Sequence, residues 1–231
     1  MLYYVCQIYN AVGKFNGVGT EIERVRKSML VDEAMEILYD EIEKTLNWKF
    51  IKSRKTFKKV VEDLVFEITF FSSKWNKSYE NIEIQCEFRL WCKKFGKSYN
   101  VNSAVGFFSL NPLNESWWNI TTNFHLENTL KCLREIIKSK VIPVLNKFET
   151  NVSTAANDFA KEPLFSEYNI SVQFIDMYAG REQAVAISKK IYADLNEKKR
   201  DEIKRYCQGA RSEPWMINPS NLRYIVDNNL I

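Results

Sequence analysis

The sequence contains little glycine and little proline, with 7 and 5 residues of each in a chain of 231. This scarcity argues against long low-complexity linkers. No apolar run approaches the ~20 residues that a transmembrane helix needs. The first twelve residues are apolar but lack the basic region and the cleavage site of a signal peptide. We therefore expect a globular, cytoplasmic protein that has no membrane among its partners.

Metal-binding, redox and nucleotide-binding motifs are missing as well. The five cysteines are scattered and form no C-x-x-C pair, which is typical of a reducing compartment and indicates neither a zinc site nor a thioredoxin-like centre. His125 is the only histidine, so sites that need two are excluded. The P-loop, the nucleophile elbow and the dinucleotide-binding glycine motif are absent too. We expect no cofactor.

Charge of one sign does not dominate the chain. Its 33 basic and 29 acidic residues leave a net charge of +4, a balance that does not predict binding to nucleic acid. Two short basic clusters occur, at Lys52–Lys59 and at Lys198–Arg205. We interpret the first as a solvated hairpin and the second as an exposed helix face.

What the chain does contain is a hydrophobic pattern with a period of two. Apolar and polar residues alternate from Ile82 to Phe95. Successive side chains of a strand point to opposite faces, so the pattern predicts a long strand with one buried and one solvated face. Such a strand belongs to an antiparallel or mixed sheet. With shorter strands predicted at 48–51, 56–61, 64–70 and 103–110, it forms an antiparallel meander of four to five strands.

The inward parities of the two longest strands suggest how they pair. They set Phe70 opposite Phe88 on the buried face. On the outer face they set Phe71 opposite Glu87 and Glu67 opposite Trp91.

Two amphipathic helices are predicted to pack on the apolar face of this meander. Thr20 and Glu23 have the spacing of a capping box at the start of a helical stretch, one helix or two, that reaches about residue 46. The second helix follows a cap at Thr122 or Asn123. Pro143 is expected to kink or split it near residue 140.

The C-terminal part of the chain is also predicted to be helical. Apolar residues at helical spacing predict a helix over 181–207 that stops at Gly209, and Asn218-Pro219 predicts the start of a short closing helix. The fold class is therefore α+β with a helical C-terminal extension. We expect an N-terminal extension at 1–28, an α+β core domain at 29–150 and a helical region at 151–231 that packs on the core.

A family resemblance supports the same fold. Two long predicted strands lie between two amphipathic helices, and a segment of large, basic and Phe residues precedes them. The segment contains Trp48-x-Phe50, Arg54 and Phe57. The strands are Leu64–Trp75, with Ser73-Lys74-Trp75 at its end, and Ile82–Cys92. Over about residues 29–149 this arrangement resembles a bacterial family known as a domain of unknown function. The resemblance implies an α+β fold and implies no activity.

Carboxylate side chains are the main candidates for catalytic residues in the sequence. Glu67, Glu83 and Glu87 are predicted on the outer face of two neighbouring strands. Two or three such groups can hold a divalent metal, and Glu83-x-Gln85 resembles a degraded acid-x-Lys element of restriction-type nucleases. An ordinary solvated strand face is the alternative, since Arg89 carries the opposite charge there. A divalent-metal-dependent hydrolase or nuclease is therefore our second functional hypothesis.

Aromatic residues at outer positions lead to the first hypothesis. Phe71 and Trp91, with Arg89 between them on the same predicted face, stand where polar residues are expected. Exposed aromatics on a sheet often mark a partner surface. The alternative is that the C-terminal helices cover this face and make it a second core. We expect a non-enzymatic protein-interaction module, for example an immunity-like protein, that binds a protein partner through these three residues; its oligomeric state is open.

Overall fold

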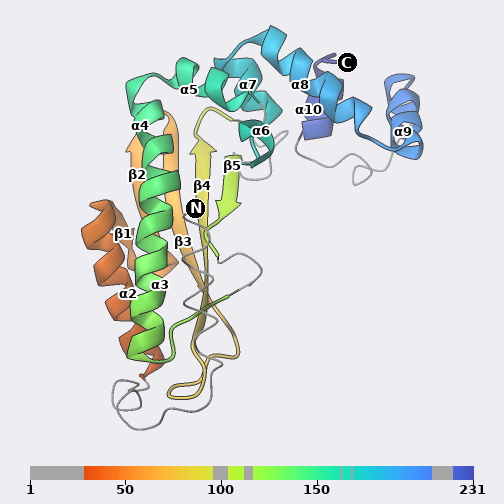
Figure 1. Ribbon diagram of the computed structural model, residues 1–231. Coiled ribbons are helices and arrows are strands. Elements are labelled where there is room, and N and C mark those ends of the chain that lie inside the picture. Colours follow the sequence, from red (N-terminus) through yellow and green to blue (C-terminus); the bar gives the residue numbers. More distant parts are fainter. Residues whose placement is uncertain (1–28, 96–103, 112–116, 162, 168, 210–220) are drawn as a thin grey trace. The chain divides into compact units, whose positions relative to one another are not determined.

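The computed structural model describes residues 29–95, 104–111, 117–161, 163–167, 169–209 and 221–231. Figure 1 labels most of the elements, which follow in this order: α2 (Val31–Leu46), β1 (Lys49–Ile51), the 3-10 turn η3 (Lys52–Arg54), β2 (Thr56–Val61), β3 (Leu64–Ser72), β4 (Glu83–Cys92), β5 (Ala104–Ser109), β6 (Trp118–Asn119), α3 (Asn123–Ile136), the π-helical turn η4 (Ile137–Val141), α4 (Ile142–Thr150), α5 (Val152–Phe159), α6 (Leu164–Glu167), α7 (Val172–Tyr178), α8 (Arg181–Ala193), α9 (Glu197–Cys207) and α10 (Asn221–Asp227).

The strands form one sheet in the order β1-β2-β3-β4-β5, as the predicted meander requires. The α+β fold with a helical C-terminal part is confirmed. The sequence did not predict β6, which pairs antiparallel with β4. A strand of two residues is too short to show a period of two. It is held beside the sheet by Trp118, whose indole N–H donates to the Leu110 carbonyl at 3.1 Å.

Backbone hydrogen bonds at the two ends of the β3–β4 pair fix its register. The Ser73 N–H donates to the Glu83 carbonyl at 3.1 Å, and the Lys93 N–H donates to the Asp63 carbonyl at 2.8 Å. Both bonds define the same offset between the strands, so the pairing is uniform from one end to the other.

The predicted register of these strands was wrong by two residues. The observed offset sets Phe70 opposite Cys86 instead of Phe88, and Phe71 opposite Gln85 instead of Glu87. A shift of two keeps each side chain on its predicted face, because side chains alternate with a period of two. Burial therefore fixes the parity, whereas the connecting loop decides the register.

The chain divides into two compact units, each built from three segments. Of the described residues, unit 1 contains those in 29–59, 67–88 and 109–143, and unit 2 contains those in 60–66, 89–108 and 144–231. Strands β2 to β5 contribute residues to both units. The division of the sequence at residues 28 and 150 stays a prediction.

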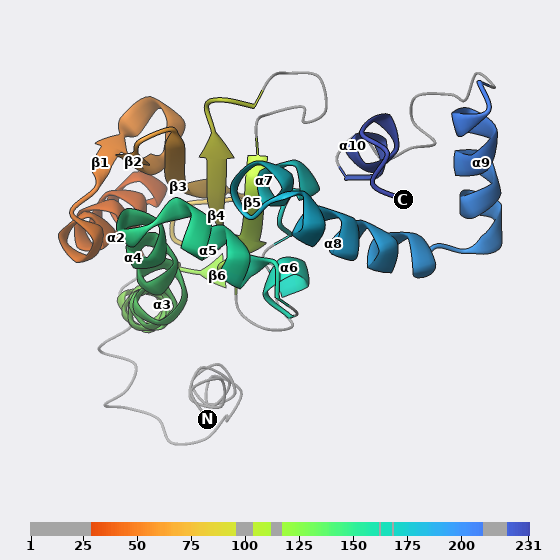
Figure 2. The ribbon, with the colours of Figure 1, turned by 90° about the horizontal axis from the view of Figure 1, so that it is seen from above.

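In unit 1, α2 and α3 lie side by side and cover one face of β1–β3 (Figures 1 and 2). The apolar stripe of α2 is buried and consists of Ala34, Met35, Leu38, Ile42 and Leu46. An ion pair between Glu41 and Arg134 joins the two helices. The predicted capping box at Thr20 and Glu23 lies outside the described residues.

Helix α3 starts and ends as the sequence indicates. Thr122 is its N-cap, and its hydroxyl accepts the His125 N–H at 3.3 Å. The π-helical turn η4 then separates α3 from α4. Pro143 follows this turn; it has no N–H, and its ring crowds the preceding turn, so a widened turn is the expected response. The predicted break near residue 140 is confirmed.

In unit 2, aromatic side chains from α4, α5 and α7 form a cluster. The ring of Phe148 lies 5.5 Å from that of Phe159 and 5.9 Å from that of Phe174, with Tyr178 next to Phe174 at 4.9 Å.

Among the described helices of the chain, none is both long and apolar enough to cross a membrane.

The single helix predicted over 181–207 is two helices in the structure, α8 and α9. Asn196 separates them, because its side chain accepts the Lys199 N–H at 2.9 Å and so caps the start of α9. The predicted stop is confirmed: α9 ends just before Gly209, which has a left-handed φ of 84°. Asn218-Pro219 lies outside the described residues.

Candidate functional site

The β1–β2 hairpin carries basic residues without acidic ones. From Lys49 to Val61, a segment that we name the basic hairpin, there are six bases and no acid: Lys49, Lys52, Arg54, Lys55, Lys58 and Lys59. The first of the two basic clusters of the sequence therefore extends over the whole hairpin.

Aromatic side chains anchor the inner face of the basic hairpin. Phe57 is fully buried, stacks on Phe50 at 4.6 Å and meets Phe70 of β3 edge-on at 6.1 Å. Tyr39 of α2 lies 4.8 Å from Phe50. Contacts of this kind add specific geometry to the burial of large apolar surface. The backbone of the hairpin is thus held firmly from one side.

The turn of the hairpin carries three of its bases. Lys55 closes the 3-10 turn with a left-handed φ of 49°, and its N–H donates to the Lys52 carbonyl at 3.2 Å. The ammonium group of Lys55 donates to the Ser72 hydroxyl at 2.9 Å. Lys52, Arg54 and Lys55 are all exposed at this end of the hairpin.

The outer face of the hairpin places two lysines opposite each other. The pairing of β1 with β2 sets Phe50 against Phe57 on the inner face and Lys49 against Lys58 on the outer face. Side chains directly opposite on neighbouring antiparallel strands lie within contact distance, and like charges there are destabilising. Lys49 is exposed and Lys58 half-buried.

The same row continues to an acidic residue on β3. The Phe70 N–H donates to the Lys55 carbonyl at 3.0 Å, a bond whose register sets Lys58 opposite Glu67. Glu67 has an exposed fraction of 4%. Its carboxylate lies 3.5 Å from the guanidinium of Arg54, which is itself 57% exposed. Arg54 therefore forms an ion pair with this buried carboxylate, and no pattern in the sequence pairs these two residues.

Four of the five lysines of the hairpin form no ion pair within the described parts of the chain: Lys49, Lys52, Lys55 and Lys58. Arg54 pairs with Glu67, and these four lysines give the basic hairpin a surplus of positive charge that no ion pair among the described residues neutralises.

The predicted partner-binding residues are divided between the units. Phe71 is half-buried in unit 1, whereas Arg89 and Trp91 are half-buried in unit 2. The guanidinium of Arg89 lies 5.9 Å from the centre of the Trp91 ring, within the range of a cation–π contact. The outer face of β3 is also buried near the start of the strand, since Val65 is 7% exposed. The predicted outer surface is therefore partly covered.

The predicted metal-binding carboxylates do not converge as a group. Glu83 and Glu87 are both half-buried on β4, four residues apart, which corresponds to about 13 Å along a strand. Glu67 is held by Arg54. Among the described residues, no three His, Cys, Asp or Glu side chains are placed to hold a metal ion together.

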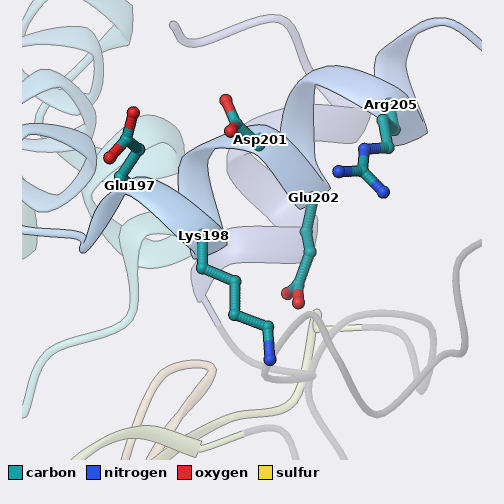
Figure 3. Close-up of a pocket in the computed structure, with 5 residues that line it drawn as sticks. All are labelled: Glu197, Lys198, Asp201, Glu202 and Arg205. Carbon is teal, nitrogen blue, oxygen red and sulfur yellow. The ribbon is translucent and has the colours of Figure 1, made fainter.

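A shallow hollow beside α9 contains charges of both signs. It has a volume of about 350 Å³ and is lined by Glu197, Lys198, Asp201, Glu202 and Arg205 (Figure 3). In Figure 3 these side chains point in different directions from one helix. Small-molecule sites are mostly apolar with a few convergent polar groups, so this hollow does not resemble one.

Comparison of the chain with protein-family models, with curated proteins and with solved structures found no match. The resemblance of residues 29–149 to a domain of unknown function therefore stays a prediction.

Proposed function

We propose that this protein is a non-enzymatic, cytoplasmic binding module that recognises an acidic surface of a protein partner through the basic hairpin. The observation that carries the proposal is the surplus charge of the hairpin: Lys49, Lys52, Lys55 and Lys58 form no ion pair with a described acidic residue. A rigid backbone beneath these side chains lowers the ordering cost of binding.

Electrostatics explains what such a surface contributes. Exposed charges add little free energy each, but a patch of one sign steers the approach of an oppositely charged partner and sets its orientation. The repulsion between Lys49 and Lys58 is also relieved when an anion arrives. An acidic partner therefore gains from both effects.

The thiols support the proposed compartment. Cys86 and Cys92 are buried and free. Burial raises the pKa of the Cys86 thiol well above its ordinary value, so this group packs as a small apolar side chain and not as a nucleophile. Free thiols of this kind are typical of a reducing environment.

The alternative, a divalent-metal-dependent hydrolase, stays a prediction. No observation on the described residues favours it, because Glu67 is paired with Arg54 and stands apart from Glu83 along the strands. A calorimetric titration with Mn²⁺ tests it directly. Binding that is lost when Glu67, Glu83 and Glu87 are changed to Ala would revive the hydrolase.

A defined acidic probe tests the proposed function. A fluorescent peptide of eight glutamates is titrated with the wild-type chain at low salt. We expect Lys52→Glu/Lys55→Glu to weaken binding by about tenfold or more, because two favourable charges become two repulsive ones. The matched control Lys198→Glu/Lys204→Glu changes the net charge equally and should stay within about twofold.

The outcome separates a surface from a general charge effect. Equal losses in the two variants would show that net charge alone attracts the peptide and would overturn the proposal. Circular dichroism confirms that both variants fold. Trp91→Ala in the same titration tests the predicted contact through Phe71, Arg89 and Trp91.

A further inference from the structure

We propose that Lys49 and Lys58 together form a subsite for a phosphate monoester, carried by a phosphorylated serine or threonine of the partner. The inference rests on the proposed function and names the chemical group that the basic hairpin recognises. Its starting point is the direct opposition of these two lysines on the outer face of β1 and β2.

The geometry brings two ammonium groups to one point. Opposite side chains of an antiparallel pair have their Cβ atoms about 4.5–5.5 Å apart. The stems of Lys49 and Lys58 leave the same face from this separation, and neither has an ion pair among the described residues. Their flexible ends can therefore converge on a single anion. The bound anion then offsets the repulsion between the two ammonium groups.

The charge balance selects the kind of anion. Lys49 and Lys58 together carry two positive charges, and the Glu67 carboxylate at the other side of Lys58 lies 3.5 Å from the guanidinium of Arg54. A phosphate monoester carries a charge of about −1.5 to −2 at neutral pH and offers three terminal oxygens. A carboxylate or a phosphodiester carries a single negative charge. The monoester is the group that matches the pair.

Nucleic acid fits the hairpin less well than a phosphorylated protein segment. Single strands are bound by a basic groove together with aromatic rings on which bases stack. The aromatic rings of the basic hairpin, Phe50 and Phe57, stack on each other on the inner face. β1 has three residues, about 10 Å of strand, which offers room for one or two phosphates.

Three peptides that differ at one position test the inference on the full chain. Each labelled octapeptide carries phosphoserine, glutamate or serine at its centre, and binding is measured by fluorescence anisotropy. We expect phosphoserine to bind about tenfold tighter than glutamate, and Lys49→Gln/Lys58→Gln to remove this preference. The matched control Lys198→Gln/Lys204→Gln should keep it.

The pH gives a second readout. The second pKa of a phosphate monoester is about 6, so the preference for phosphoserine over glutamate should shrink between about pH 7.5 and 5.5. Equal affinity of the phosphoserine and glutamate peptides at high pH would overturn the inference. So would a preference that survives Lys49→Gln/Lys58→Gln.

The two proposals fail in different ways. If the eight-glutamate peptide depends on Lys52 and Lys55 but phosphoserine has no advantage, the inference fails and the proposed function stands. If the eight-glutamate peptide does not distinguish the hairpin from α9, the proposed function fails. A ten-nucleotide thymidine strand is the last arm. Tighter binding to it than to the phosphoserine peptide would replace the monoester by a nucleic-acid backbone.

Discussion

The basic hairpin and α9 contain similar numbers of basic residues but differ in what surrounds them. The hairpin has six bases and no acid, whereas α9 has five bases and three acids. On α9, Lys199 pairs with Glu202 at 3.6 Å and Lys204 with Asp201 at 3.4 Å. A helix brings residues three apart onto one face, so neighbouring charges in the sequence neutralise each other. The neighbours of a strand come from other parts of the chain, and β3 places the acidic residue Glu67 beside the hairpin.

The two segments also differ in how they are anchored. Of the α9 side chains, Ile203 alone is buried. The hairpin is held by Phe57 and by the rings of Phe50, Tyr39 and Phe70 around it. On such an anchor the charged side chains extend from a backbone that is held in place, which favours recognition.

The largest expected effect comes from removing the anchor. Phe57→Ala should lower the free energy of unfolding by about 3–5 kcal/mol, because it empties a fully buried aromatic position. Urea denaturation measures it. Phe57→Leu serves as the control and should cost less, since it fills more of the space. A loss below about 1 kcal/mol in Phe57→Ala would contradict the view that the inner face fixes the hairpin.

The second-largest effect concerns Glu67, the acidic residue that β3 places beside the hairpin. Arg54→Ala should destabilise the chain by about 1–3 kcal/mol, because it removes a cation that lies 3.5 Å from the buried carboxylate of Glu67. The double variant Arg54→Ala/Glu67→Gln should recover part of the loss, since the buried negative charge is gone as well.

A double-mutant cycle in urea denaturation gives the coupling between the two side chains. If the effects of Arg54→Ala and Glu67→Gln simply add, the ion pair contributes nothing, and the basic hairpin would then carry a fifth base without a partner.

The third prediction has opposite signs in the two segments. Lys49→Gln should stabilise the chain by about 0.2–1 kcal/mol, because it removes a like charge opposite Lys58. Lys204→Gln should destabilise it by about 0.2–0.5 kcal/mol, because it removes a partner of Asp201. Thermal denaturation in low and high salt measures both, and salt should diminish both effects. The same sign in the two variants would remove the distinction between hairpin and helix.

The sequence was sufficient for the fold because the fold depends on a repeated pattern. Alternation from Ile82 onward gave the strand β4 and its buried face, where Ile84 and Cys86 are fully buried. The register of β3 against β4 was wrong because no pattern within a strand records the length of its loop. The break between α8 and α9 had a signal, Asn196, since an Asn before a charged helical turn is a good N-cap.

Only part of the candidate site could be predicted from the sequence. The absence of acids from Lys49 to Val61 is visible in the sequence and distinguishes the hairpin from α9. The burial of Glu67 and its pairing with Arg54 are not visible, because the two residues lie thirteen positions apart and no local rule brings them together. The same holds for Lys49 and Lys58, whose opposition depends on where the hairpin turns.

The smallest effect is a pH dependence at a lysine that does have an acidic neighbour. The pKa of Glu41 is lowered, first by the hydrogen bond from the Lys44 ammonium at 2.7 Å and further by Arg134. A carboxyl group whose pKa is lower in the folded state stabilises the fold above its unfolded pKa, and this contribution is lost as the pH falls through the folded value.

Glu41→Gln should therefore lower the melting temperature at pH 7, where the wild-type carboxylate is charged in both states. The difference between variant and wild type should shrink as the pH falls below about 4, the ordinary pKa of a glutamate, and vanish once the folded pKa has been passed. Melting curves at several pH values in that range measure it. A difference that grows towards low pH would contradict the stabilising contact between Glu41 and Lys44.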